Sequence, residues 1–264
     1  MSIKIKNIEA CCQCGNKDCS YIDAKLKTNF YGLRTEETVC PTQILVDGPL
    51  EKAKADILDE KNCINCGLCE LSCHCSNLCC IDIDFTSNSF ENLTKQQSNA
   101  IACSYLNYIF DFAANTNRNS ALQFDGYVCT INGNEAFIQI DQDNDSLECL
   151  RRIIGDFLLY SPIDRKIQIG VIVLLELPRE GSRDVYNVLK ALEEFPTTSN
   201  YKFYFTTFNL LRLMALNLKD FNYDFEDLLL DLSVKGAKDK LFTKLNSLIP
   251  NMDNVIRCLL NIDK

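Results

Sequence analysis

The chain has 264 residues, of which 47% are hydrophobic and 24% are charged, and its formal net charge at pH 7 is −9. This composition indicates a globular protein long enough for two domains, and its acidic balance argues against broad nonspecific binding to nucleic acid. The first residues, "MSIKIKNIEA", lack the apolar segment of a secretory signal, and the longest apolar run, residues 167–177, has about half the length of a membrane span. We therefore expect a cytoplasmic protein with no membrane segment.

Cysteine is concentrated at the start of the chain, where 12 of the 16 cysteines fall within the first 80 residues. Disulfides are rare in a reducing cytoplasm, so this density indicates metal or redox chemistry. The four later cysteines stand among apolar residues, and we interpret them as buried structural thiols. They are Cys103, Cys129, Cys149 and Cys258.

Two cysteine motifs define this first region. In "CCQCGNKDC", residues 11–19, two residues separate Cys11 from Cys14 and four separate Cys14 from Cys19. In "CINCGLCELSC", residues 63–73, the spacing is C-x2-C-x2-C-x3-C. Successive three-residue steps wrap a loop around three corners of a compact inorganic cluster, and backbone N–H groups can then point at the sulfides. Structural zinc usually uses two separated C-x2-C pairs, so the second motif favours iron–sulfur over zinc.

The second motif resembles the cluster loop of bacterial two-cluster ferredoxins. Residues 40–63, "CPTQILVDGPLEKAKADILDEKNC", are similar to the segment that this family places between its two motifs, with a Cys-Pro pair, a strand, a turn and a second strand. Gly67 would relieve crowding where the chain passes close to a cluster. In the family, the cysteine before proline ligates the cluster of the other motif. The resemblance therefore implies one 4Fe–4S cluster held by Cys40, Cys63, Cys66 and Cys69.

The resemblance also implies a second 4Fe–4S cluster, which Cys73 would share with the first motif. That motif departs from the family pattern, because its last spacer has four residues and no proline follows Cys73. We interpret His74, the single histidine, as a neighbour of the clusters or a solvent-facing residue rather than a ligand. A third cluster is disfavoured because no third motif with three-residue steps exists. The expected ligands are Cys11, Cys14, Cys19 and Cys73, with Cys12 as an alternative to Cys11, and Cys75, Cys79 or Cys80 as alternatives to Cys73.

Residues 84–92 are polar and predict a linker. We therefore expect an α+β ferredoxin-like iron–sulfur domain over residues 1–84 and a three-layer α/β domain over residues 85–264. Hydrophobic periodicity, the Asn132-Gly133 turn signal and a long apolar run predict the elements of the second domain. In chain order these are a helix over 93–116, a hairpin over 124–141, a helix over 145–161 capped by Asp145 or Ser146, a strand over 166–177, a helix over 182–195, a strand over 201–208, and mainly helix over 209–264.

This order of elements resembles the core of the restriction-endonuclease-like PD-(D/E)xK nucleases. That family places an acid at the start of the hairpin's first strand and an acid-x-lysine pair on its second strand, and the carboxylates hold Mg²⁺ for phosphodiester hydrolysis. The resemblance assigns Asp125 to the first position, and Gln139 and Asp141 to the acid and lysine positions. Glu91 or Glu135 would supply a further carboxylate. A solvated aspartate at a strand start is the competing interpretation of Asp125.

Three functional hypotheses follow. The first is ferredoxin-type electron transfer or redox sensing by two 4Fe–4S clusters, without catalysis, through a protein partner docked on the α/β domain. The second is an intact or degenerate nuclease, or a subunit in DNA processing or defence, that uses Mg²⁺ and has structural clusters. The third is a non-catalytic assembly subunit. The ferredoxin spacing favours the first hypothesis, and the large appended domain favours the other two.

Overall fold

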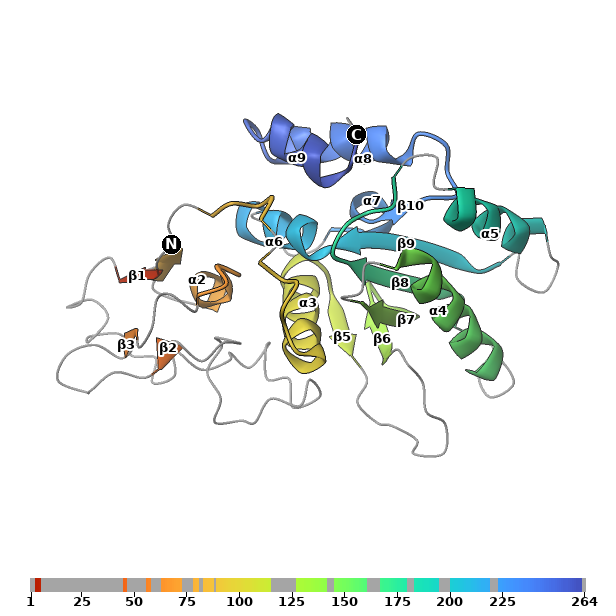
Figure 1. Cartoon of the computed structure of the whole chain (residues 1–264), viewed down its shortest axis with the longest axis horizontal. Helices are drawn as coiled ribbons and strands as arrows, with labels where there is room; N and C mark the ends of the chain where they lie inside the picture. Colours follow the sequence, from red (N-terminus) through yellow and green to blue (C-terminus); the bar gives the residue numbers. More distant parts are fainter. Residues whose placement is uncertain are drawn as a thin grey trace. The chain divides into compact units, whose positions relative to one another are not determined.

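The computed structural model divides into two compact units, Met1–Asn107 and Tyr108–Lys264 (Figure 1). Within the residues described, it is a mixed α/β protein with an open six-stranded mixed sheet and eight helices. None of the helices in these ranges has both the length and the apolar character needed to cross a membrane. The structure describes residues 3–5, 45–46, 56–57, 63–72, 78–80, 83–87, 89–114, 127–141, 145–160, 167–179, 183–194, 200–218 and 223–262.

The first unit contains short strands around the second cysteine motif. Strand β1 (Ile3–Ile5) pairs antiparallel with β4 (Leu78–Cys80), and β2 (Leu45–Val46) pairs antiparallel with β3 (Asp56–Ile57). The helix α2 (Leu68–Ser72) begins inside the motif. The ferredoxin-like fold of residues 1–84 stays a prediction, because most of those residues lie outside the described part. The boundary after residue 84 likewise stays a prediction about independent folding.

The helix α3 (Lys95–Ile109) begins at a capping box. The hydroxyl of Thr94 accepts a hydrogen bond from the N–H of Gln97 at 3.2 Å, and Oε1 of Gln97 accepts one from the N–H of Thr94 at 2.9 Å. The predicted helix over 93–116 is too long, because β5 (Phe112–Ala114) is a strand. The pairing of β5 with residues 129–131 of the hairpin outweighs the helical spacing of the apolar residues in this segment.

The second unit is built on the six-stranded sheet, in the order β10-β9-β8-β7-β6-β5. The neighbouring strands β5, β6 and β7 are antiparallel, whereas β7, β8 and β9 run parallel and β10 is antiparallel to β9 (Figure 1). The strands not yet given are β6 (Tyr127–Ile131), β7 (Asn134–Ile140), β8 (Ile169–Leu174), β9 (Lys202–Thr207) and β10 (Leu230–Asp231).

The predicted hairpin is present between β6 and β7. Asn132 and Gly133 have φ angles of 47° and 77°, which are the left-handed values that a tight two-residue hairpin turn requires. The predicted apolar strand is β8, of which residues 171–174 are buried. The two-residue strand β10 was not predicted, since two residues carry no periodic signal.

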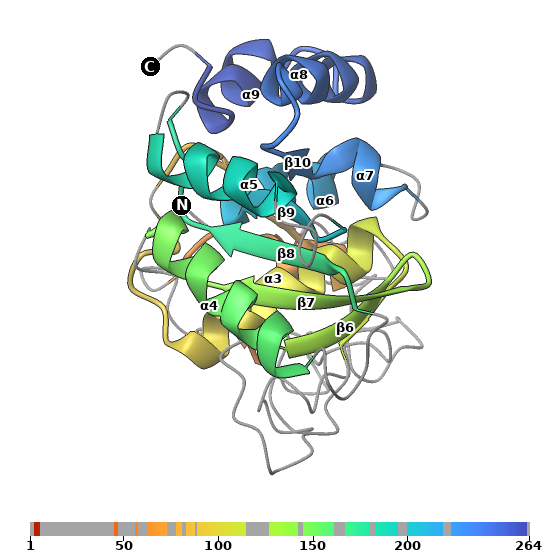
Figure 2. The same ribbon diagram turned by 90° about the vertical axis from the view of Figure 1, so that its right-hand side faces the viewer.

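The helix α4 (Ser146–Tyr160) packs closely on the sheet, and Figure 2 shows α4 and α5 (Arg183–Glu194) in front of its strands. Phe157 of α4 lies edge-on to Phe137 of β7 with ring centroids 5.2 Å apart. A Cβ atom at Gly170 of β8 would lie 3.0 Å from Cδ1 of Ile153 of α4 and 3.0 Å from Cδ1 of Phe203 of β9. The remaining helices are α6 (Phe208–Asn217), α7 (Phe225–Leu228), α8 (Ala237–Leu248) and α9 (Asp253–Leu259).

Three of the four later cysteines are buried as predicted. Cys103 and Cys129 are each 1% exposed and Cys149 is fully buried. Cys258, however, is exposed on α9. Residues two positions apart on a helix lie on nearly opposite sides, and Ile256 takes the buried side.

Candidate functional site

The structure describes three of the eight predicted cluster ligands. Cys66 and Cys69 are buried, with 7% and 4% of their surfaces exposed, and Cys63 is half-buried. The predicted ligands that lie outside the described residues are Cys11, Cys14, Cys19, Cys40 and Cys73, together with the alternatives Cys12 and Cys75 and with His74. For Cys79 and Cys80 only the backbone is described, in β4.

The loop that carries these three cysteines, residues 63–69, turns through two left-handed residues. Asn65 has φ 55° and Gly67 has φ 80°, values that glycine adopts freely and asparagine tolerates best among the other residues. The backbone N–H of Asn65 donates a hydrogen bond to Sγ of Cys63 at 3.4 Å. The loop then enters α2, where the carbonyl of Gly67 accepts hydrogen bonds from two N–H groups of the first turn. The loop therefore turns tightly, and the backbone N–H of Asn65 points at the sulfur of Cys63.

A buried tyrosine of α3, Tyr105, is hydrogen-bonded to this loop. The hydroxyl of Tyr105 donates a hydrogen bond to the carbonyl oxygen of Cys66 at 2.5 Å, and the two residues are 39 positions apart in the chain. The side chain of Tyr105 is fully buried. The sequence indicates Tyr105 only as one apolar position of a helix, because no local pattern signals a hydrogen bond over that separation.

The donor set of the loop suits a soft metal centre, since it offers thiols and no histidine or carboxylate ligand. Its left-handed turns and its N–H to sulfur bond also suit a loop that wraps a cluster. Over the part of the chain that the structure describes, no group of three or more His, Cys, Asp or Glu side chains is arranged to hold a metal ion. Cys63, Cys66 and Cys69 are therefore not arranged around a common metal position in this structure, and the fit to a cluster rests on the type of donor, since the other predicted ligands lie outside the described residues.

A second group of polar residues lies where β7 ends. Gln139 and Asp141 are buried, with 2% and 6% of their surfaces exposed. Residues two apart on a strand face the same side of the sheet, so both belong to the face that α4 covers. Among the described residues, Oε1 of Gln139 has no hydrogen-bond partner. Asp125, the third residue that the nuclease resemblance implies, lies outside the described residues.

The carboxylate of Asp141 is tied to α4. The thiol of Cys149 donates a hydrogen bond to Oδ2 of Asp141 at 2.7 Å, in a buried environment. Burial raises the pKa of Cys149 far above its usual value, and the Asp141 carboxylate raises it further. Cys149 therefore remains a protonated donor at neutral pH and is not a nucleophile. No sequence pattern predicts the bond between Cys149 and Asp141, because the two residues lie on different elements.

A cation also lies within electrostatic range of Asp141. Burial alone would lower the pKa of Arg152, but the carboxylates of Asp141 and Glu148 raise it overall. Its Nε donates a hydrogen bond to Oε1 of Glu148 at 3.3 Å. Glu135, by contrast, is at the opposite end of β7 and exposed, roughly 13 Å from Gln139 at the usual rise per residue. The structure thus brings Gln139, Asp141 and Arg152 into one region and leaves Glu135 outside it.

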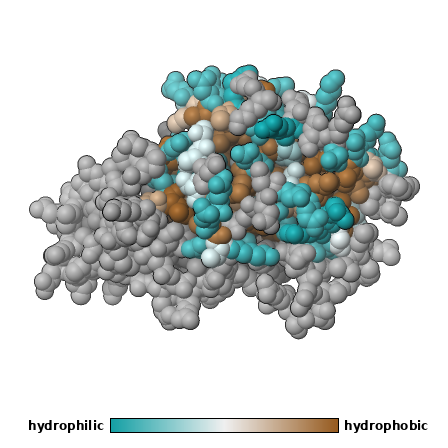
Figure 3. Space-filling view, in the orientation of Figure 1, coloured by the Kyte–Doolittle hydropathy of each residue, from teal (hydrophilic) through white to brown (hydrophobic). Residues whose placement is uncertain are grey.

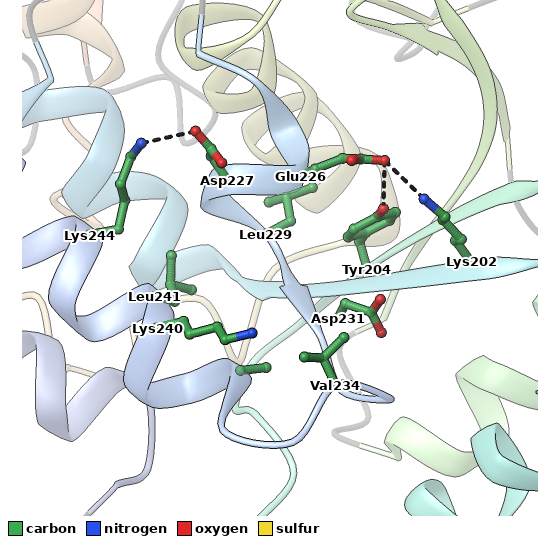
Figure 4. A pocket seen from close by; sticks show the side chains of 11 residues that line it. Lys202, Tyr204, Glu226, Asp227, Leu229, Asp231, Val234, Lys240, Leu241 and Lys244 are labelled. Atoms are coloured by element: carbon green, nitrogen blue, oxygen red, sulfur yellow. Dashed lines mark hydrogen bonds and ion pairs between the residues drawn. The ribbon is translucent and has the colours of Figure 1, made fainter.

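A third feature is an open hollow of about 400 Å³ between β9, β10, α7 and α8 (Figure 4). Glu226 accepts a hydrogen bond from the hydroxyl of Tyr204 at 3.0 Å and pairs with Lys202 at 3.3 Å. Lys244 pairs with Asp227 at 2.9 Å. The ionisable residues of this hollow, Tyr204 apart, are three lysines and three carboxylates, namely Lys202, Lys240, Lys244, Glu226, Asp227 and Asp231.

The opposite charges of the hollow compensate one another, so it does not present the one-signed field that a polyanion needs. Burial, followed by the hydrogen bond to Glu226, raises the pKa of Tyr204, which keeps its hydroxyl protonated. Val234, which is 40% exposed, also lines the hollow, and it is the one exposed large hydrophobic residue within the described ranges. In the face shown in Figure 3, hydrophilic side chains interrupt the apolar ones over the described part of the molecule.

Comparison with protein-family models, with curated proteins and with solved structures finds no match to this chain.

Proposed function

We propose that this chain is an iron–sulfur protein that binds two 4Fe–4S clusters and serves in single-electron transfer or redox sensing. The observation that carries this proposal is the conformation of the 63–69 loop. Its three thiols, of which those of Cys66 and Cys69 are buried, alternate with two left-handed residues, and a backbone N–H donates to Sγ of Cys63. When bound, the clusters supply one-electron chemistry, and the role of the chain is to hold them, orient them and limit their access to water.

Eight cysteines would divide between the two clusters. By resemblance to the two-cluster ferredoxins, Cys40, Cys63, Cys66 and Cys69 hold one cluster, and Cys11, Cys14, Cys19 and Cys73 hold the other. Buried thiols support this assignment, because a cluster shielded from water is better protected from loss of iron. The remaining cysteines of the first 80 residues would then pack around the clusters.

The second unit would serve as the docking platform for a protein partner. The balanced charge of its hollow and the net charge of −9 for the whole chain both disfavour nucleic acid as the main partner. A single-electron carrier needs a partner that donates or accepts the electron. A redox enzyme or a complex subunit in the cytoplasm would fill this role.

The proposal is tested by the metal content of the full chain purified without oxygen. Two clusters predict about eight iron and about eight sulfide per chain. Cys66→Ser should lower both by about half, because it removes a ligand from one cluster. Cys103→Ser is the matched control, since Cys103 is also buried, in α3, but lies outside the motifs. Stoichiometric zinc with little iron in the wild type would contradict the proposal.

A second function, Mg²⁺-dependent phosphodiester hydrolysis on a three-layer restriction-endonuclease-like core, is supported by the group at the end of β7. Magnesium prefers oxygen ligands, and Oε1 of Gln139 and the carboxylate of Asp141 offer two on one face of a strand. The cationic Arg152 would replace the lysine that the nuclease pattern expects at position 141. Asp125 would complete the site. Metal-dependent cleavage of DNA or RNA that disappears in Asp125→Ala would support this function.

A further inference from the structure

We propose that Tyr105 is a positioning residue for the cluster bound by the 63–69 loop, and that its hydrogen bond to the carbonyl of Cys66 raises the reduction potential of that cluster. The inference rests on the proposed iron–sulfur function, because it concerns the same loop. It identifies a residue of α3, outside both cysteine motifs, that tunes the electron-transfer site.

The geometry places the hydroxyl of Tyr105, a buried polar group of α3, on the loop. The side chain of Tyr105 is fully buried, and its hydroxyl donates to the carbonyl oxygen of Cys66 at 2.5 Å. Its neighbours on α3, Ile101, Ala102 and Leu106, are also fully buried. In such apolar surroundings a hydrogen bond is electrostatically stronger than in water, and the peptide group that receives it is held in one orientation.

The peptide that Tyr105 holds lies between Cys66 and Gly67. In a trans peptide the N–H points opposite to the carbonyl, so the N–H of Gly67 is directed away from the hydroxyl of Tyr105. Gly67 has φ 80°, so the peptide can take this orientation without steric strain. The hydroxyl therefore determines the direction of a backbone donor between two of the predicted ligands, Cys66 and Cys69.

A hydrogen bond to the carbonyl oxygen also polarises the peptide and makes its N–H a stronger donor. Backbone donors near an iron–sulfur cluster favour its reduced state, which carries one more negative charge. Tyr105 should therefore raise the reduction potential of this cluster. Phenylalanine would fill the same space but would leave the carbonyl of Cys66 without this donor.

The experiment is a redox titration, followed by electron paramagnetic resonance, of the full chain purified without oxygen. It compares the wild type with Tyr105→Phe, with 3-fluorotyrosine incorporated at position 105, and with Tyr108→Phe. Fluorine makes the phenol more acidic and hence a stronger donor, with little change in size. Tyr108→Phe removes a hydroxyl from the same helix, three residues further on, and serves as the matched control.

In Tyr105→Phe we expect the ratio of reduced to oxidised cluster, at a fixed potential, to fall by about twofold. The affected signal should be the one that Cys66→Ser removes. The 3-fluorotyrosine chain should shift the same signal in the opposite direction, and Tyr108→Phe should leave it unchanged. A tyrosine that only supports the fold would give no such opposed pair of shifts.

Two results would overturn the inference, and they have different meanings. If the wild type binds iron and sulfide but neither change at position 105 moves the potential, Tyr105 has no tuning role and the proposed function stands. If the wild type binds no clusters, the proposed function fails and the inference fails with it. If Tyr105→Phe loses iron, the 3-fluorotyrosine chain decides, because it retains the hydroxyl.

Discussion

The thiol of Cys149 donates a hydrogen bond to Oδ2 of Asp141 across 2.7 Å, joining the first turn of α4 to the end of β7. Both residues are buried, so a carboxylate that would be costly to bury alone has a donor on the neighbouring element. Burial, followed by this bond, raises the pKa of the thiol and keeps it protonated, and the bond holds the carboxylate in place.

The first prediction concerns the reactivity of this thiol. Burial and Asp141 together raise the pKa of Cys149, so Asp141→Asn should lower it by removing the negative charge. A decrease of one pKa unit gives about tenfold more thiolate at a given pH below the pKa. We expect about tenfold faster alkylation of Cys149 at pH 9, measured by mass spectrometry of the peptide.

Cys129 is the internal control for that measurement, since it is also buried and lies on β6, away from Asp141 in sequence. Faster alkylation of both cysteines would mean that Asp141→Asn merely loosens the fold. An unchanged rate at Cys149 would contradict the electrostatic role of Asp141.

The second prediction concerns the packing of α4 on the sheet. Gly170→Ala places a Cβ atom 3.0 Å from side-chain atoms of Ile153 and Phe203, which must move. We expect a loss of about 1–3 kcal/mol in the free energy of unfolding, measured by urea titration with circular dichroism.

Gly155→Ala is the matched control on the same helix, at a position that faces open space. Gly155 lies in the interior of α4, and a Cβ atom there meets nothing within 4 Å. Alanine has the higher helix propensity, so this change should stabilise the protein by up to about 1 kcal/mol. Equal effects of the two changes would argue against close contact between α4 and β8.

The third prediction concerns the division of ligands between the clusters. Cys40 and Cys66 should serve the same cluster, although 26 residues separate them. Cys40→Ser and Cys66→Ser should therefore remove the same spectroscopic signal and largely spare the other. Loss of different signals would exclude the crossed arrangement.

The fourth prediction concerns nuclease activity. The acid that Mg²⁺ chemistry needs at position 139 is a glutamine, and the chain is acidic, so we expect no robust cleavage of DNA or RNA with Mg²⁺ or Mn²⁺. The assay compares the wild type with Asp125→Ala and, as a control, with Glu135→Gln, which alters an exposed carboxylate at the far end of β7.

Cleavage that requires metal, disappears in Asp125→Ala and survives in Glu135→Gln would favour the nuclease over the electron carrier. Cleavage that survives in both variants would indicate a contaminating enzyme.

The fifth prediction concerns folding. Bound clusters contribute their binding free energy to a small cysteine-rich domain, so removal of iron should unfold residues 1–84. Residues 85–264 should keep their own thermal transition, followed by calorimetry. A single loss of structure over the whole chain would contradict the predicted boundary.

Local signals in the sequence determined most elements of the second unit. The Asn132-Gly133 pair specifies its own turn, because both residues accept the left-handed φ that the hairpin needs. Asp145 caps α4 by accepting a hydrogen bond from the N–H of Glu148 at 2.9 Å, as its position before an apolar helix predicts. Such signals act within a few residues and are visible in the sequence alone.

Partnerships between distant residues were decided only by the tertiary structure. Phe112 has helical spacing in the sequence, but it pairs with Ile131 in the sheet, where its backbone joins the ladder and its side chain is buried. The bond of Tyr105 to Cys66 and that of Cys149 to Asp141 likewise join separate elements. No periodicity or spacing in the sequence encodes these hydrogen bonds. A buried polar group needs a hydrogen-bond partner, and the packing of separate elements decides which partner is near enough.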